Sequence, residues 1–360
     1  QPERLREVPD IGPKRAGLIA GAWEEQKQVK EIMLFLHGHG VSTNLAIKIY
    51  KQYGENALQV VQTDPYRLAR DIFGIGFKTA DRIAQALGLP IDHPARIEAG
   101  VVYALNQATD DGHVYLPAHQ LAEQAAQLLV VAPEKIPPAL ERLAQEDRVQ
   151  QEALPADQVA PASSKSISES QGSYTTPVVY LKPMYYSETG VAERLRSLAD
   201  AMPSRLSDLP PAFVRLDSML SPEQQAAIRT ALSHPVSVLT GGPGTGKTTA
   251  LRALITVLEE GRKRYALASP TGRAAKRLAQ ATGQAASTIH RLLEPSPSEG
   301  FRRNASNPLD LDMLVVDEVS MLDLNLAYHV LKALKPGTHL LLVGDVDQLP
   351  SVGAGDVLRN

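Results

Sequence analysis

The chain has 360 residues, a formal net charge of −3 at pH 7 and 43% hydrophobic residues, which is typical of a globular protein with a buried core. This length predicts about two or three domains. No apolar run approaches the roughly 18 residues of a membrane helix, and the lack of cysteine excludes disulfide scaffolds, cysteine zinc sites and thiol nucleophiles. A cysteine-free chain fits a reducing cytoplasm, so we expect a cytoplasmic protein without membrane contacts.

The first hundred residues contain three similar segments, each with an apolar residue, a glycine-containing turn and a helical apolar pattern. The turns fall at residues 11–13, 38–40 and 74–76. Glycine suits such turns because it adopts positive φ angles without a steric cost. From these residues alone, the segment 1–94 is either an all-helical scaffold with glycine caps or a tandem binding module.

The segment GIGFKTADRIA at 74–84 resembles the helix-hairpin-helix family most clearly. The resemblance implies that hairpin N–H groups and the N-terminus of the following helix contact a DNA phosphate, which positions a protein without reading sequence. Pro13 departs from the pattern, because it replaces the second glycine of the first copy. The DNA-binding residues implied here are Gly38, Gly40, Gly74, Gly76 and Lys78.

The middle of the chain is predicted to be mostly helical and then irregular. Residues 95–155 show helical patterns with a short extended piece at 112–116, and they resemble a winged-helix-like unit, although a helical spacer fits equally well. Residues 156–176 are rich in Pro and Ser, which predicts a flexible linker. Within 177–216, a strand is predicted at 178–186 and a helix from Ser187 to Leu198.

From residue 217 to 360 the pattern changes to alternating strands and helices. Short apolar runs occur at 236–240, 265–269, 313–317 and 339–345, with helical patterns between them. Strands bridged by helices predict a parallel sheet covered on both faces. The overall prediction is therefore an α/β protein whose parallel-sheet domain follows an all-α region.

The first strand runs directly into GGPGTGKTT at 241–249, which matches the phosphate-binding pattern G-x-x-x-x-G-K-[ST]. Glycines let backbone N–H groups surround phosphates, the Lys247 ammonium reaches the β- and γ-phosphates, and the Thr248 hydroxyl binds Mg²⁺. ATP and Mg²⁺ are the expected cofactors. The predicted nucleotide-binding residues of this loop are Gly242, Pro243, Gly244, Thr245, Gly246, Lys247, Thr248 and Thr249.

Two later strands end in polar residues that complete the predicted catalytic set. Asp317 follows an apolar run and is placed to hold Mg²⁺ with Thr248, and Glu318 is placed to orient and deprotonate a water molecule. After the last strand, Gln348 is placed to sense the γ-phosphate, and Asp345 to add to the Mg²⁺ shell. The predicted catalytic residues are thus Lys247, Asp317, Glu318 and Gln348.

Several motifs together resemble superfamily 1 helicases of the RecD type. They are GGPGTGKTT, DEVSM at 317–321, GDVDQLPSVGAG at 344–355, LSPEQQAAI at 220–228, SPTGRAAKRLAQATG at 269–283 and TIHRLL at 288–293. The resemblance implies a RecA-like motor domain, adenine recognition by Gln224, and an ATP-dependent helicase that moves 5′→3′ on DNA in repair or recombination. It also implies strand contacts by Pro270, Thr271, Gly272, Arg273, Thr288 and His290.

The charge pattern supports the same region as a nucleic-acid contact. Seven basic residues and no acidic residue lie between Glu260 and Glu294, which on its own fits either a solvated basic face or a nucleic-acid site. The expected partners are single-stranded DNA and duplex junctions. A protein partner for the hairpin region and the oligomeric state stay open.

The sequence departs from the helicase pattern at its end. The family has a second RecA-like half with arginines that complete the ATP site, and neither follows the third motif here. We therefore expect a portion of a longer protein, with residues before Gln1 as well, and expect residues 1–360 alone to hydrolyse ATP weakly without unwinding DNA. The alternatives are another DNA-associated P-loop ATPase of the AAA+ clamp or branch-migration type, a non-enzymatic DNA-binding module, and an RNA helicase.

Overall fold

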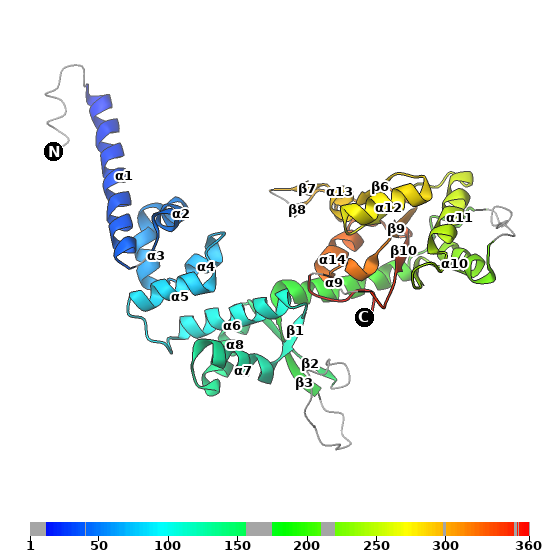
Figure 1. Cartoon of the computed structure of the whole chain (residues 1–360). Helices are drawn as coiled ribbons and strands as arrows, with labels where there is room; N and C mark the ends of the chain where they lie inside the picture. The colour runs from blue at the N-terminus through cyan, green and yellow to red at the C-terminus, as the bar shows by residue number, and fades with distance from the viewer. Residues whose placement is uncertain are drawn as a thin grey trace. The chain divides into compact units, whose positions relative to one another are not determined.

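The computed structural model describes residues 12–39, 41–155, 175–209, 220–297, 300–348, 351 and 353–359. The chain divides into two compact units. The N-terminal unit comprises Gln1–Leu105 and Pro117–Asp147, and the C-terminal unit comprises Asn106–Leu116 and Arg148–Asn360 (Figure 1). Within the described ranges, no helix combines the length and apolarity that crossing a bilayer requires.

Helices make up the N-terminal unit (Figure 1). Its core is formed by apolar side chains that recur at helical spacing, and among them Leu36, Ile49 and Leu68 are fully buried. The helices are α1 (Pro13–Gly38), α2 (Thr43–Tyr53), α3 (Ala57–Thr63), α4 (Arg67–Asp71), α5 (Phe77–Ala86), α6 (Pro94–Asp110, shared with the other unit), α7 (Ala118–Leu129) and α8 (Ile136–Gln145).

Of the three predicted glycine turns, the one at 74–76 lies between α4 and α5. Of the turn at 38–40, Gly38 ends α1 and Gly40 lies outside the described residues, and α2 begins at Thr43. The first predicted turn, at 11–13, lies partly outside the described residues, and Pro13 opens α1 behind Gly12. Proline is well tolerated there because the first helical N–H has no partner within the helix.

A small three-stranded sheet joins the two segments of the C-terminal unit. Its strands are β1 (Tyr115–Pro117), β2 (Val149–Pro155) and β3 (Thr175–Leu181), in the order β1-β3-β2. Strands β2 and β3 are antiparallel and pair from Val149–Leu181 to Pro155–Thr175. Residues 156–174, which are most of the predicted linker, lie outside the described residues. The residues on either side of this segment, Pro155 and Thr175, pair with each other in the small sheet.

The prediction of a strand through residue 186 is wrong at its C-terminal end. Strand β3 ends at Leu181, and α9 (Lys182–Ala199) begins five residues earlier than expected. Pro183 lies in the first turn of α9, where a residue without an N–H costs nothing. The aromatic residues that suggested strand alternation are therefore split between β3 and the start of α9.

A five-stranded parallel sheet forms the main layer of the C-terminal unit, in the order β4-β10-β9-β5-β6. Its strands are β4 (Val236–Thr240), β5 (Tyr265–Ser269), β6 (Ala286–Thr288), β9 (Met313–Val316) and β10 (His339–Gly344). The four predicted strands are confirmed to within one residue at each end. Sequence patterns missed β6 and the short hairpin of β7 (Pro295–Ser296) and β8 (Gly300–Phe301).

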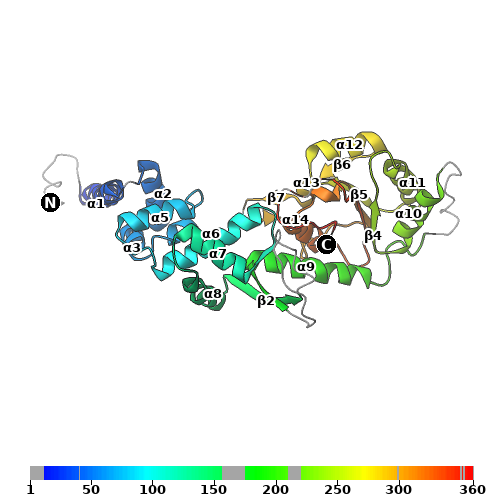
Figure 2. The same ribbon diagram turned by 60° about the horizontal axis from the view of Figure 1, so that its bottom comes forward.

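Helices cover both faces of this sheet, because alternate strand residues point to opposite sides. Leu314 and Val316 pack with α9, α13 (Ile289–Leu293) and α14 (Leu324–Lys332). Met313 and Val315 pack with the helices of the other face, α10 (Pro222–Ser233), α11 (Lys247–Glu260) and α12 (Gly272–Thr282). Figure 2 shows α10 and α11 next to β4. The predicted α/β class with a covered parallel sheet is confirmed.

Candidate active site

The loop 241–246 connects β4 to α11 in the manner the phosphate-binding pattern predicts. Gly244 and Gly246 have φ angles of +79° and +84°, which disfavour side chains, and a Cβ atom at Gly246 would lie 2.2 Å from Gln224 Nε2. Lys247 begins α11, and its Nζ donates to the carbonyl of Gly241 and, over 2.9 Å, to that of Gly242. The ammonium group is thus held over the loop whose N–H groups would surround a phosphate.

A cavity of ≈ 380 Å³ brings the predicted catalytic residues together. Its wall comes from the loop after β4, the residues after β9 and the residues after β10, at the carboxyl ends of three neighbouring strands. The lining residues are Gly242, Pro243, Gly244, Thr245, Gly246, Lys247, Thr248, Leu251, Arg277, Asp317, Glu318, Gly344, Asp345 and Gln348. Thr249, also predicted to bind nucleotide, is exposed on α11.

The acidic pair follows β9 directly. The Asp317 N–H donates to the carbonyl of Ala268 on β5 over 2.9 Å, which fixes its backbone beside the neighbouring strand. Burial raises the pKa of Asp317, and the nearby Glu318 raises it further, while Lys247 lowers it. Glu318 itself has a φ of +58°, a left-handed conformation that costs a non-glycine residue about 1 kcal/mol or more. Such a strained residue in the cavity is typical of a functional position.

The residues after β10 form a second polar group in the cavity. Asp345 is only 4% exposed, and its Oδ1 accepts from the Asp347 N–H over 3.1 Å. Gln348 Nε2 donates to Asp345 Oδ2 over 3.3 Å. The Gln348 side chain is therefore oriented within the same cavity as Lys247. Leu349, Pro350 and Val352 of this motif lie outside the described residues.

Gln224 lies in the first turn of α10. Its Oε1 accepts from the Ser221 N–H over 3.0 Å and its Nε2 donates to the Gly246 carbonyl over 3.3 Å, so both amide atoms bond to backbone. Ser221 completes a reciprocal capping box with Gln224. A separate cavity of ≈ 170 Å³ beside Gln224 includes Leu239 and Ala250 in its wall. The contact between Gln224 and adenine stays a prediction.

The predicted strand-contacting residues lie in two adjacent segments. Residues 270–273 follow β5, and residues 288–290 run from the last residue of β6 into α13; the two strands pair in register from Leu267–Ala286 to Ser269–Thr288. The side chains of Thr271 and Thr288 each cap a helix, accepting from the N–H groups of Ala274 and Arg291 respectively. Arg273 and His290 are exposed. Their contact with DNA is not tested by these positions and stays a prediction.

The turn at 72–76 between α4 and α5 has the tight backbone geometry expected of a helix-hairpin-helix turn. Gly74 has a φ of +87°, and the nearby Lys48 Nζ donates to the carbonyl of Phe73 over 3.2 Å. Gly76 precedes α5, and Lys78 in the first turn of that helix is exposed. Of the other predicted contacts, Gly38 is the last residue of α1, and Gly40 lies outside the described residues.

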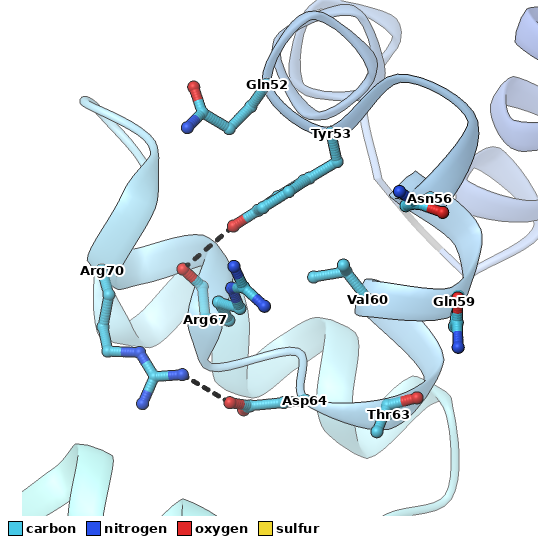
Figure 3. Close-up of a pocket in the computed structure, with 9 residues that line it drawn as sticks. All are labelled: Gln52, Tyr53, Asn56, Gln59, Val60, Thr63, Asp64, Arg67 and Arg70. Carbon is cyan, nitrogen blue, oxygen red and sulfur yellow. Dashed lines mark hydrogen bonds and ion pairs between the residues drawn. The ribbon is translucent and has the colours of Figure 1, made fainter.

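Sequence analysis did not identify a hollow of ≈ 640 Å³ bounded by α2, α3 and α4 (Figure 3). Arg67 pairs with Asp71 over 2.9 Å, and Arg70 pairs with Asp64 over 2.5 Å. Burial, reinforced by a hydrogen bond to Asp71, raises the pKa of Tyr53 to about 12. Both arginines of the hollow therefore have carboxylate partners, and the Tyr53–Asp71 bond joins α2 to α4.

The parallel sheet and the cavity at its carboxyl edge define a P-loop nucleotide-binding protein. Residues 224–354 match a family model described as an AAA domain. Residues 25–115 match the model of the "ATP-dependent RecD2 DNA helicase HHH domain", a range that contains the turns at 38–40 and 74–76 but not the one at 11–13. With the relatives described next, these matches show that the chain is similar to RecD-type DNA helicases in both regions.

Two curated relatives are similar to the chain. The ATP-dependent RecD2 DNA helicase of Deinococcus radiodurans is 36% identical over 357 residues, which cover 98% of this chain and 48% of the relative. The RecBCD enzyme subunit RecD of Mycolicibacterium smegmatis is 42% identical over 208 residues, which cover 51% of this chain and 37% of the relative. The chain thus spans about half or less of the length of these relatives.

A solved structure of the Pif1 helicase from Candida albicans is 28% identical over 37% of this chain and 34% of that chain. The TM-score of that match is 0.29.

Proposed function

We propose that this chain belongs to an ATP-dependent DNA helicase that translocates 5′→3′ on single-stranded DNA and unwinds duplexes. The observation that carries the proposal is the cavity that joins Lys247, Asp317, Glu318 and Gln348, next to the segment 270–273. The similarity to RecD-type helicases supports the helicase activity, and the 5′→3′ direction is what the resemblance to that family implies. The cellular location proposed is the cytoplasm.

The residues of the cavity suit ATP hydrolysis. Lys247 and the loop N–H groups bind the β- and γ-phosphates, and the Gln348 amide contacts the γ-phosphate. Glu318 orients the attacking water and accepts its proton. The hydroxyl of Thr248 and the buried carboxylate of Asp317 are hard oxygen donors that fit Mg²⁺, with Asp345 close by, and the ion supplies charge neutralisation on the phosphates when bound.

The DNA-binding part of the proposal has two components. Residues 270–273 and 288–290 contact the backbone of the single strand, and the turns at 38–40 and 74–76 contact phosphates of DNA near a junction. Backbone contacts of this kind give little sequence preference and a steep dependence on salt. The order helix–strand–helix–helix–strand–strand from α6 to β3 supports a winged-helix-like unit between these components.

ATP hydrolysis by the full-length protein, with and without single-stranded DNA, tests the proposal. We expect strong stimulation by DNA, and we expect Lys247→Ala and Glu318→Gln each to abolish hydrolysis. Hydrolysis that is indifferent to DNA would instead favour another class of P-loop ATPase. If the wild type does not hydrolyse ATP and Lys247→Ala binds DNA as the wild type does, the result would favour a non-enzymatic binding module.

A further inference from the structure

Arg277 lines the nucleotide cavity, and the function proposed above gives it no role. Arg277 lies in the middle of α12, and its Nη2 is 3.0 Å from Glu318 Oε1. The Arg277 side chain is 66% exposed and that of Glu318 is 20% exposed. The ion pair therefore lies at the opening of the cavity, with the guanidinium on the solvent side of the carboxylate.

The position of Arg277 is set by a firmly packed helix. Ala274, Ala275 and Leu278 of α12 are buried, and Arg277 lies on the flank of that buried face, roughly 100° around the helix. The helix begins at Gly272, and Thr271 accepts a hydrogen bond from the Ala274 N–H at its start. Arg277 is five residues beyond Gly272, which corresponds to about 7.5 Å along the helix axis.

The same short helix therefore links two sites. Its first residues belong to the segment 270–273, which is the proposed contact with single-stranded DNA. Little more than one turn later it holds the carboxylate that is proposed to act on water. Because a packed helix moves as a unit, a displacement of its first turn also displaces Arg277.

The ion pair with Arg277 determines where the carboxylate of Glu318 points. The left-handed backbone at residue 318 limits where its side chain can point. With Oε1 bonded to Arg277, that oxygen is directed to the guanidinium instead of to a water beside the phosphates. The ion pair thus competes directly with the orientation that hydrolysis requires.

We propose that Arg277 is a positioning residue that holds Glu318 away from the attacking water until single-stranded DNA contacts the start of α12. The inference rests on the proposed helicase function. DNA binding at residues 270–273 shifts α12, the ion pair opens, and Glu318 turns to the water. In this way α12 alone couples DNA binding to the stimulation of ATP hydrolysis.

Steady-state ATP hydrolysis by full-length wild type, Arg277→Gln and Arg277→Lys tests this role. For Arg277→Gln we expect the DNA-free kcat to rise about two- to fivefold, the size expected for loss of a partly exposed ion pair. The KM for ATP should change less than twofold, and the ratio of DNA-stimulated to DNA-free kcat should fall by the same factor as the basal rate rises. Arg277→Lys keeps the charge and should restore most of the wild-type ratio.

Arg196→Gln is a matched control, because it removes one exposed arginine from α9 of the same unit, outside the nucleotide cavity. Its basal rate and its stimulation ratio should equal those of wild type. Circular dichroism of each variant establishes that it is folded.

The outcomes separate this inference from the proposed function. If wild-type hydrolysis is not stimulated by DNA, both the proposed function and the role of Arg277 are wrong. If wild type is stimulated and Arg277→Gln keeps the same basal rate and ratio, only the positioning role is wrong. A tenfold or greater fall of the DNA-free kcat in Arg277→Gln also overturns it, because Arg277 would then promote the reaction.

Discussion

Gln224 Nε2 donates to the carbonyl of Gly246 over 3.3 Å, so the first turn of α10 is tied to the last glycine of the phosphate-binding loop. Gln224→Ala removes this bond and the capping box with Ser221. Because one such hydrogen bond contributes ~1 kcal/mol, we expect the KM for ATP to rise about fivefold in full-length protein. Gln225→Ala is the control, because the Gln225 amide donates to the Leu220 carbonyl instead of the loop. An equal rise of KM in both variants would contradict a role of the Gln224–Gly246 hydrogen bond in ATP binding.

Two features of the structure favour glycine at position 246. Its φ is +84°, and a Cβ atom would lie 2.2 Å from Gln224 Nε2. The unfavourable backbone alone costs about 1–3 kcal/mol, so Gly246→Ala should lose measurable binding of a fluorescent ATP analogue. Gly242 has no φ in the left-handed region and no atom within 4 Å of its Cβ position, so Gly242→Ala should lose less affinity. Equal losses would show that any side chain in the loop is excluded by the nucleotide itself.

Gly76 permits a test of the hairpin that separates binding from folding. A Cβ atom at Gly76 meets nothing within 4 Å and its φ is −93°, so Gly76→Ala should leave the unfolding midpoint unchanged. If the N–H groups before α5 bind a phosphate, the added methyl group obstructs that approach and duplex affinity should fall at least about tenfold. Fluorescence anisotropy with labelled duplex DNA across a salt series measures it. Unchanged affinity would mean that this hairpin is only structural.

His339 makes the stability of the C-terminal unit depend on pH. Its Nδ1 can only donate to the Ala231 carbonyl, 3.0 Å away, so its Nε2 accepts from the Ser204 hydroxyl over 2.7 Å, an arrangement of the neutral ring. Burial lowers the pKa of His339 below its ordinary 6.5, and the charge of His234 lowers it further. The unfolded chain therefore binds a proton that the folded chain does not, and stability is lost as pH falls through 6.5 towards the folded pKa.

The unfolding free energy of wild type and His339→Gln at pH 7.5 and 5.5 tests this dependence. The variant should be less stable at pH 7.5 but should lose less on acidification, since Gln does not titrate. Hydrogen exchange of β10 amides reports the C-terminal unit separately from the other unit. A wild-type loss no larger than that of the variant would assign the pH dependence to other groups.

Features that depend on a local residue pattern could be predicted from the sequence. Short apolar runs predicted β4, β5, β9 and β10, and the spacing of Gly241, Gly246 and Lys247 predicted the phosphate-binding loop. These predictions succeed because a short apolar run and the spacing of glycines in a turn both depend on residues that are close together in sequence. The turn at 74–76 was found for the same reason.

Contacts between residues that are distant in sequence could not be predicted in this way, because they depend on how the elements pack. The strand order β4-β10-β9-β5-β6 places residues 317, 318 and 348 beside the loop after β4, although about 70 to 100 residues separate them in sequence. The pairing of Arg277 with Glu318 depends on how α12 packs on that sheet, and the bond from Gln224 to Gly246 on how α10 does. The early start of α9 was likewise hidden, because aromatic residues fit strand and helix alike until packing selects one. Long-range packing has no local signature in one sequence, and here it decides which side chains share the cavity.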